Sequence, residues 1–547
     1  MADVKSGEPF GLDNSFITSI DWDLALARVI YDMRSDFIFA PHLRFICSRA
    51  GHEIIKQVKA DLKSGAFSLS VPITIEVPKS QSMRVAVPSR RGGPPYSRPG
   101  SILLPNDRLF YQALADQAAT IIDEKTNKQR SFSHRLAEAQ SPSTFLPTRT
   151  CWSNLQEALA RMVRSKSAQY ILKIDVANFF GSLNQHTMIN ILNDAGYPKP
   201  LSSRLEALLT SYTGERSSRG ILQGMFPSDL LGNHYMAPID DFLEEYGVPS
   251  ARYVDDIYIF VESVDSADRL VRELIPHLRD YDLALNEAKS VIMPKASFLT
   301  EEPDLEALFS NAVEEISNQV EDNDFDADYG FQSEWEDDEE DEEDGQDDGL
   351  ELKATKILFD SVFEYPGQEE NIERFCLPLF SKAESDYAVD HVLDSFKKRP
   401  SMSQIYASYL SKFLDKEEVK ELLPILLADT SLRDWQKMWI LAALLQRKPE
   451  DDGPVKIALR ILKDATRHDA LRAVAAIFVG RYGDHARRKN LFSIYSTVSN
   501  FIQSAIYFSS RSWPPVERGN AKASWGSHSP LNTLLTSAMG NQKKSSS

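Results

Sequence analysis

The sequence has few cysteines and no long apolar segment. Its three cysteines, Cys47, Cys151 and Cys376, are far apart in the chain, so neither a disulfide framework nor a zinc cluster is indicated. No apolar run reaches the roughly 18 residues that a membrane span needs, and the first residues lack the basic and then apolar pattern of a signal peptide. We therefore expect a cytoplasmic protein with no membrane partner.

Basic residues are missing from one segment. Residues 301–350 contain 23 Asp and Glu but no Lys or Arg, and the rest of the chain has 57 acidic and 61 basic residues. The net charge of -19 therefore arises in this segment, which we predict to be a disordered linker. It would either imitate nucleic acid and restrain activity or serve as a solvating insert. Residues 51–200 carry 19 Lys and Arg against 11 Asp and Glu, an excess that suits a phosphate backbone.

Two adjacent acids lie in a stretch that favours β-strands. Residues 251–260 are rich in β-branched and aromatic side chains, and Asp255 and Asp256 interrupt them where a tight turn would fall. We predict a hairpin with both carboxylates at its tip. Because like charges repel, such a pair is best kept ionised by divalent cations, and Mg²⁺ prefers carboxylates together with substrate phosphates. Taken alone, paired aspartates in a turn more often serve only the turn.

A third acid changes this interpretation. Asp175 ends an apolar strand that begins near Tyr170, and a helix is predicted to follow. Three acids at the ends of strands indicate metal-assisted phosphoryl or nucleotidyl transfer, in which one ion activates the attacking hydroxyl and the other neutralises the leaving group.

The order of these motifs resembles the palm of reverse transcriptases. The family usually has proline before the glutamine and glycine of one of its palm motifs. This chain has Leu222 before Gln223 and Gly224, and this departure relaxes the loop. The residue before the paired acids is Val254, and a branched residue at this position resembles reverse transcriptases. RNA-dependent RNA polymerases more often have glycine there. The matching segments are Asp175 to Phe180, Leu222-Gln223-Gly224 with Ser228, Tyr253-Val254-Asp255-Asp256, and Leu285-Asn286 with Lys289.

The resemblance implies a role for each matching position. Two Mg²⁺ ions would be bound, with Mn²⁺ as an alternative, and a bulky aromatic ring would restrict the substrates to dNTPs. The implied catalytic residues are Asp175, Asp255 and Asp256, and the implied metal ligands are the same three with the backbone carbonyl of Val176. The implied nucleotide-binding residues are Arg98, Arg135, Phe180, Gln223, Gly224 and Lys289, and Tyr253 would contact the primer.

Several positions also have a purely structural interpretation. Arg98 equally fits a solvated side chain in a basic, glycine-rich loop over residues 89–100, and Lys289 fits a surface lysine. Asp107 is expected to cap a helix over residues 108–123. His134 is expected to be a packed residue rather than a catalyst.

Three further structural alternatives concern the palm. Successive residues at a strand end cannot share a face, so one of Phe179 and Phe180 is expected to lie in the core. Ser228 is expected to cap a helix over residues 228–242. Tyr253 would pack its ring as a strand residue whether or not it contacts the primer.

The fold class expected is an α+β right-hand polymerase, with fingers and an antiparallel palm sheet with helices, followed by an all-α HEAT-like repeat domain. Strands are predicted over residues 69–77 and 83–87, and short amphipathic helices recur between residues 371 and 508. The expected division is residues 1–169 for N-terminal helices and fingers, 170–300 for the palm, 301–350 for the acidic linker, 351–510 for the helical repeats and 511–547 for a flexible tail.

A palm followed by helical repeats resembles the bacterial antiphage, abortive-infection group of reverse transcriptases. This resemblance implies DNA synthesis that arrests phage infection, with or without a template and in some members primed from a protein hydroxyl. RNA or DNA partners and a homo-oligomer formed through the helical repeats are expected. Two alternatives are a catalytically silent scaffold that binds RNA or a protein partner, and a retroelement enzyme. Candidate priming tyrosines, each of which also fits the core, are Tyr406, Tyr409, Tyr495 and Tyr507.

Overall fold

The computed structural model describes residues 9–79, 97–213, 217–301, 348–363 and 369–545. The chain forms two compact units, and neither is continuous in sequence. The first unit comprises Met1–Asp32, Ile55–Pro72 and Leu103–Pro303, and the second comprises Met33–Ile54, Ile73–Ile102 and Asp304–Ser547. The units differ from the contiguous ranges expected from the sequence, because parts of the N-terminal region belong to the helical second unit.

The first unit is organised around a four-stranded antiparallel sheet with the strand order β4-β5-β3-β6. β-Branched and aromatic residues form its strands, as expected for a pleated and buried surface. The strands are β3 (Tyr170–Asp175), β4 (Ser250–Tyr253), β5 (Asp256–Val261) and β6 (Val291–Pro294). This is the palm-type sheet that the sequence predicted, and the hairpin between β4 and β5 is confirmed.

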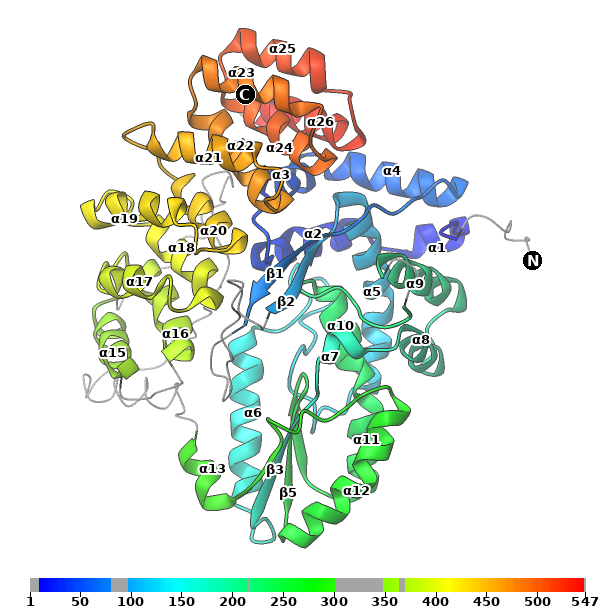
Figure 1. Ribbon diagram of the computed structural model, residues 1–547. Coiled ribbons are helices and arrows are strands. Elements are labelled where there is room, and N and C mark those ends of the chain that lie inside the picture. Colours follow the sequence, from blue (N-terminus) through cyan, green and yellow to red (C-terminus); the bar gives the residue numbers. More distant parts are fainter. Residues whose placement is uncertain (1–8, 80–96, 214–216, 302–347, 364–368, 546–547) are drawn as a thin grey trace. The chain divides into compact units, whose positions relative to one another are not determined.

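Helices cover both faces of this sheet (Figure 1). On one face, α6 (Thr148–Val163) packs Leu155 and Leu159 against Ile171, Tyr258 and Phe260. The helices α11 (Ala237–Glu245) and α12 (Val264–Asp280) lie on the other side in Figure 1. The remaining helices of this unit are α1 (Asn14–Ser19), α2 (Trp22–Asp32), α5 (Pro105–Lys125), α7 (Phe179–Ser182), α8 (Gln185–Asp194), α9 (Lys199–Tyr212), α10 (Phe226–Tyr235) and α13 (Lys295–Glu301).

Two predicted helix caps are wrong. The α5 helix begins at Pro105, a residue suited to a first helical position, so Asp107 lies inside the first turn. The Asp107 carboxylate instead accepts a hydrogen bond from the backbone N–H of Ser70. Ser228 likewise lies inside α10, with its hydroxyl 3.0 Å from that of Tyr111. The single helix expected over residues 228–242 is two helices, because α10 ends at Tyr235 and α11 begins at Ala237, with Pro238 in its first turn.

The second unit is an array of short helices in two layers, together with a small hairpin. The even-numbered helices from α16 to α26 each contact the next even-numbered one, and odd-numbered helices pack against them. Helices of this inner layer also contact β1 and α3. The central helices of this layer, α20, α22 and α24, are buried on nearly all sides; in α22, every residue from Ala470 to Gly480 is buried. The predicted helix-rich region is confirmed, and its HEAT-like character stays a prediction.

The elements of the second unit follow the amphipathic segments of the sequence closely. The elements are α3 (Pro41–Arg49), the first turn of α4 (Gly51–Ser64), whose larger part belongs to the first unit, β1 (Ile73–Pro78), β2 (Ser97–Ile102), α15 (Asp348–Asp360), α16 (Glu369–Lys382), α17 (Val389–Ser395), α18 (Ser403–Ser411), α19 (Glu417–Ala428), α20 (Asp434–Leu444), α21 (Gly453–Lys463), α22 (Asp469–Tyr482), α23 (His485–Tyr495), α24 (Asn500–Ser509), α25 (Pro515–Trp525) and α26 (Pro530–Ser545), with short 3-10 turns at Met33–Ser35, Ser361–Phe363, Pro400–Met402 and Ser510–Ser512.

The flexible tail predicted for residues 511–547 is wrong. This region forms α25 and α26, and it buries Trp513, Trp525 and Leu535 in the second unit. Asn532 is fully buried and donates hydrogen bonds to the Tyr495 hydroxyl and to the carbonyl of Trp525. The abundant Ser, Gly and Asn of this region hid the few large apolar residues that order it.

The β2 strand replaces part of the loop expected over residues 89–100. It pairs with β1 in antiparallel register, with Gly100 opposite Ile75. A Cβ atom at Gly100 would lie 2.7 Å from side-chain atoms of Phe37 and Val77, so this close approach requires glycine. The predicted strand over residues 83–87 and almost all of the acidic segment 301–350 lie outside the described residues.

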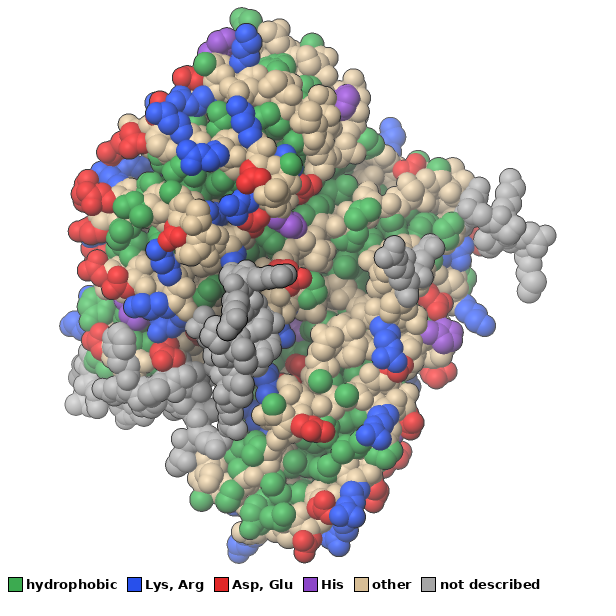
Figure 2. Space-filling model, viewed as in Figure 1, with side chains coloured by type: hydrophobic (Ala, Val, Ile, Leu, Met, Phe, Trp, Pro, Cys, Tyr) green, Lys and Arg blue, Asp and Glu red, His purple; other side chains and the backbone are tan. Residues whose placement is uncertain are grey.

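Charges of both signs are mixed over the visible surface of the helices in Figure 2. This agrees with a chain whose acidic excess is concentrated in residues 301–350. Among the helices that the structure describes, none has the length and apolarity needed to cross a membrane.

The four tyrosines considered as priming residues are all buried. Tyr406 and Tyr409 are at most 1% exposed, and their hydroxyls donate hydrogen bonds to Glu373 and to the carbonyl of Ser385, respectively. Tyr495 and Tyr507 are also in the core. Their interpretation as core residues is confirmed.

Candidate active site

The three predicted acids converge in the first unit. Asp175 is the last residue of β3 and lies directly opposite Asp256, the first residue of β5. Directly opposed residues in an antiparallel pair point to the same face of a sheet, so these two side chains share a face. Asp255 lies in the two-residue turn between β4 and β5, next to Asp256. Both acids therefore lie at the tip of the hairpin, Asp255 in the turn and Asp256 at the start of β5.

The surroundings of Asp175 come from the Leu285–Ser290 segment. The side-chain amide of Asn286 donates to Asp175 Oδ2 at 2.8 Å, and the ammonium of Lys289 lies 2.9 Å from Oδ1. The backbone N–H of Asn286 also donates to the Asp175 carbonyl. The motif residues Asn286 and Lys289, which are distant from Asp175 in sequence, are therefore held against the same carboxylate.

The Val176 carbonyl takes no part in the backbone hydrogen bonds between the end of β3 and the Leu285–Ser290 segment. Val176 lies opposite Leu285 in a short antiparallel bridge. The two hydrogen bonds that flank this bridge involve the Asp175 carbonyl and the Ala177 N–H, so neither involves the polar groups of Val176. Val176 thus occupies a non-hydrogen-bonded position of a short antiparallel ladder. Its carbonyl oxygen is suited to the ligand role that the resemblance implies.

The carboxylates of Asp175 and Asp256 repel that of Asp255. Burial, together with the charges of Asp256 and Asp175, raises the pKa of Asp255 to about 6, and the nearby charge of Lys289 opposes this rise. A carboxylate that is half-buried among other carboxylates is costly to ionise unless a cation is present. This cluster is the feature that a catalytic site holding divalent cations requires.

The donor set fits hard divalent cations. Carboxylate and carbonyl oxygens are the ligands that Mg²⁺ and Mn²⁺ prefer. As they stand, however, no three His, Cys, Asp or Glu side chains of the described segments are arranged to hold a metal ion. Both oxygens of Asp175 accept hydrogen bonds from Asn286 and Lys289.

The two phenylalanines after Asp175 have different environments. Phe179 is 3% exposed and belongs to the core, whereas Phe180 is half-buried. Their rings are in edge-to-face contact at 5.2 Å. A Cβ atom at Gly232 of α10 would lie 2.9 Å from the Phe180 ring, so this glycine makes room for the ring. The expectation that one of the pair is core is confirmed, and the role of Phe180 in sugar selection stays a prediction.

Gln223 and Gly224 lie in the segment just before α10. Gly224 has a φ of +95°, a backbone conformation that favours glycine. Gln223 is half-buried. The left-handed glycine explains why this motif needs that residue type, and the contact of Gln223 with a nucleotide stays a prediction.

Tyr253 is placed beside an exposed tryptophan that the sequence argument missed. Tyr253 ends β4, and its ring makes an edge-to-face contact with Trp152 of α6 at 5.2 Å. The Trp152 side chain is 37% exposed, which is unusual for so large an apolar group. The only sign of Trp152 in the sequence was its place near the start of the helix that precedes the first palm strand.

The predicted fingers residues fall in different units. Arg135 is half-buried in the first unit, with its guanidinium 3.4 Å from the Ser131 carbonyl. The neighbouring His134 packs against Phe145 at 5.0 Å, and burial lowers its pKa to about 4, which agrees with a packed residue. Arg98 lies on β2 in the second unit. The phosphate-binding roles of both arginines stay predictions.

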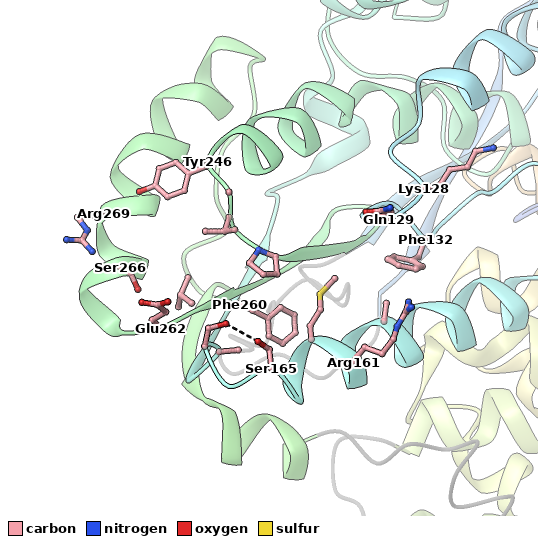
Figure 3. Close-up of a pocket in the computed structure, with 18 residues that line it drawn as sticks. Lys128, Gln129, Phe132, Arg161, Ser165, Tyr246, Phe260, Glu262, Ser266 and Arg269 are labelled. Atoms are coloured by element: carbon pink, nitrogen blue, oxygen red, sulfur yellow. Dashed lines mark hydrogen bonds between the residues drawn. The ribbon is translucent and has the colours of Figure 1, made fainter.

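A separate cavity of about 870 Å³ opens at the far end of the sheet (Figure 3). Its lining includes Phe260 and Val261, the last two residues of β5, together with Met162 and Arg161 of α6. None of the predicted site residues lines it. The candidate active site is therefore at the other end of β5, where the strand begins.

Comparison with known proteins supports the class of this domain. Residues 97–301 match the family model of the reverse transcriptase, or RNA-dependent DNA polymerase, domain. The chain thus carries a reverse transcriptase domain, with all the palm motifs inside the matched range. A search of curated proteins gave no match.

Solved structures similar to this chain include yeast telomerases. Telomerase from Candida albicans with the TWJ fragment of telomeric RNA has 11% identity and a TM-score of 0.24, covering 63% of this chain and 56% of that one. Telomerase from Candida tropicalis with the same fragment has 11% identity and a TM-score of 0.30, covering 78% and 67%. Apo telomerase from Candida tropicalis has 10% identity and a TM-score of 0.29, covering 89% and 74%. The chain spans just over half the length of the first of these.

Proposed function

We propose that the first unit catalyses Mg²⁺-dependent transfer of dNMP units to a 3′-hydroxyl, as an RNA-directed DNA polymerase. The observation that carries this proposal is the direct pairing of Asp175 with Asp256, beside the turn residue Asp255. The match of residues 97–301 to the reverse transcriptase model supports it independently.

The proposed metal ligands are Asp175, Asp255, Asp256 and the carbonyl of Val176. When bound there, two Mg²⁺ ions would lower the pKa of the attacking hydroxyl and neutralise the pyrophosphate leaving group, and Mn²⁺ would substitute for them. Lys289, which contacts Asp175 in this structure, is proposed to contact the triphosphate and to protonate the leaving group. Its side chain is 66% exposed and so is accessible to a substrate.

The remaining predicted residues are proposed to bind substrate. Arginine is suited to phosphate because its planar guanidinium grips two oxygens and keeps its charge. The Phe180 ring would exclude a 2′-hydroxyl, and Tyr253 would contact the end of the primer. The proposed dNTP-binding residues are Arg98, Arg135, Phe180, Gln223, Gly224 and Lys289.

The biological role that we propose is antiphage defence by abortive infection in the bacterial cytoplasm. The support for it is the succession of a reverse transcriptase domain and a helix-rich unit, which resembles that group of enzymes. A HEAT-like repeat surface on the second unit would then mediate homo-oligomer formation. RNA or DNA would be the partner, and synthesis would be templated, template-independent or protein-primed.

A second candidate function is a catalytically silent scaffold that binds RNA or a protein partner. The observation that favours it is the engagement of Asp175 by Asn286 and Lys289, which satisfies the carboxylate without a metal ion. A retroelement enzyme is a third candidate with the same chemistry as the first.

One assay separates these functions. Purified full-length protein is incubated with Mg²⁺ and labelled dNTPs, with and without prior RNase treatment. Asp255→Ala is compared with Asp268→Ala, an exposed α12 residue that serves as the matched control. We expect incorporation by the wild type and by the control only. Product that survives RNase indicates template-independent synthesis, and label that stays on denatured protein indicates protein priming. Absence of incorporation in every condition favours the scaffold.

A further inference from the structure

The β4 strand contains a buried arginine with no role in the sequence argument. The side chain of Arg252 is 2% exposed, and that of its partner Asp240 in α11 is 3% exposed. The Arg252 Nε and Nη2 atoms donate to the two carboxylate oxygens at 2.6 to 3.2 Å. A buried ion pair is costly to desolvate and adds little stability compared with apolar packing, so it suggests a specific positioning role.

The other donors of Arg252 point to the turn and to its supports. Nη1 donates to the carbonyl of Val254 at 2.8 Å and to Oδ1 of Asn233 at 2.9 Å, while Nη2 also donates to the Ser131 hydroxyl at 3.1 Å. A guanidinium has five N–H groups in a fixed fork. All five have an acceptor here, so the guanidinium is held in one position, and its hydrogen bond fixes the position of the Val254 carbonyl.

A second contact fixes the other polar group of the same residue. The backbone N–H of Val254 donates to the hydroxyl of Ser133 at 2.8 Å. Ser133 in turn donates to Oδ1 of Asn233 at 3.1 Å, and the Asn233 amide donates to the Ser133 carbonyl. Both backbone polar groups of Val254 are therefore bound by side chains of one buried network.

The held residue has an unfavourable backbone conformation. Val254 has a φ of +55°, and a β-branched residue is a genuine outlier in that region. Such conformations persist where the surroundings determine them, and they concentrate at functional sites. The next residue along the turn is Asp255.

We propose that this network positions the Asp255 carboxylate by clamping Val254 in its left-handed conformation. The turn clamp comprises Ser133, Asn233, Asp240 and Arg252. Within it, Ser133 and Arg252 are positioning residues because they contact the turn backbone directly. The catalytic consequence rests on the proposed function, whereas the structural consequence does not.

Two buried serines provide a matched test. Ser131 and Ser133 are both fully buried, and both donate to Asn233 Oδ1. Only Ser133 contacts Val254. We expect Ser133→Ala to lower kcat for dNTP incorporation by about 10- to 100-fold, the usual range for residues that orient metal ligands, with little change in the KM for dNTP. Ser131→Ala should lower kcat much less at a similar melting temperature.

A rescue variant distinguishes clamping from general destabilisation. Glycine adopts a positive φ without the steric cost that valine has. In the double variant Ser133→Ala with Val254→Gly, the turn no longer depends on the clamp to the same degree, so part of the lost kcat should return. Loss of activity that follows the melting temperature, with no return in the double variant, would overturn the proposal.

Hydrogen exchange tests the clamp without any activity. In metal-free protein, Ser133→Ala should accelerate exchange of the Val254 amide, whereas Ser131→Ala should leave it close to the wild type. Equal exchange at Val254 in both variants would overturn the clamp. If the wild type incorporates no nucleotide but the exchange result holds, the proposed function fails and the clamp stands.

Discussion

The burial of Asp255 and the repulsion from its acidic neighbours predict that a neutral residue at this position makes the metal-free fold more stable. The pKa of Asp255 rises from 3.8 to about 6 on folding. At about 1.4 kcal/mol for each pKa unit, ionised Asp255 disfavours the folded state by about 3 kcal/mol at pH 8. Because the pKa is raised, this penalty develops as the pH increases from about 4 to 6 and is constant above that range. Asp255→Asn should remove it.

Denaturation in EDTA measures this effect. We expect Asp255→Asn to raise the free energy of unfolding by about 1 to 3 kcal/mol at pH 8, and we expect the gain to become small near pH 4. Added Mg²⁺ should stabilise the wild type more than the variant, because cations relieve the repulsion. Asp268→Asn, at an exposed site on α12, should change stability little in either condition. A gain that is independent of pH, or a loss at pH 8, would refute this reasoning.

Three further predictions concern catalysis and packing. Lys289→Ala should lower kcat by about 100-fold or more in dNTP incorporation if its ammonium acts as a proton donor, and an unchanged kcat would exclude that role. Phe180→Ala should raise the ratio of ribonucleotide to deoxynucleotide incorporation by about 10-fold or more, as measured in parallel reactions; an unchanged ratio would contradict steric selection. Gly480→Ala should lower the free energy of unfolding by about 1 to 3 kcal/mol in urea titration, because its Cβ would overlap the Ser509 side chain. Gly519→Ala, where a Cβ meets nothing within 4 Å, is the control and should not destabilise the protein.

Short-range patterns explain why much of the palm could be predicted. The β-branched and aromatic residues of 251–260, interrupted by two acids, indicated the hairpin, and the apolar run before Asp175 indicated β3. Helical periodicity likewise placed most helices of the second unit. These signals depend on residues close together in the sequence, so they survive without knowledge of the tertiary fold.

Long-range packing decided what the sequence did not reveal. The β2 strand contains Pro99 and Gly100, which have low strand propensity, and it forms by pairing with β1. The discontinuous units arise because residues 73–102 pack with helices that lie far away in sequence. The contacts of Arg252 with Asp240 and Asn233 could not be inferred either, because nothing in the sequence shows which polar residues share a buried site.

The direct test of the central claim is anomalous diffraction from crystals grown with Mn²⁺ and a non-hydrolysable dNTP analogue. The proposed chemistry predicts two manganese peaks about 3.5 to 4 Å apart, bound by Asp175 and Asp255, with Lys289 moved from Asp175 to the triphosphate. Crystals in which the analogue is bound but no manganese lies at these carboxylates, or in which Lys289 still holds Asp175, would contradict it.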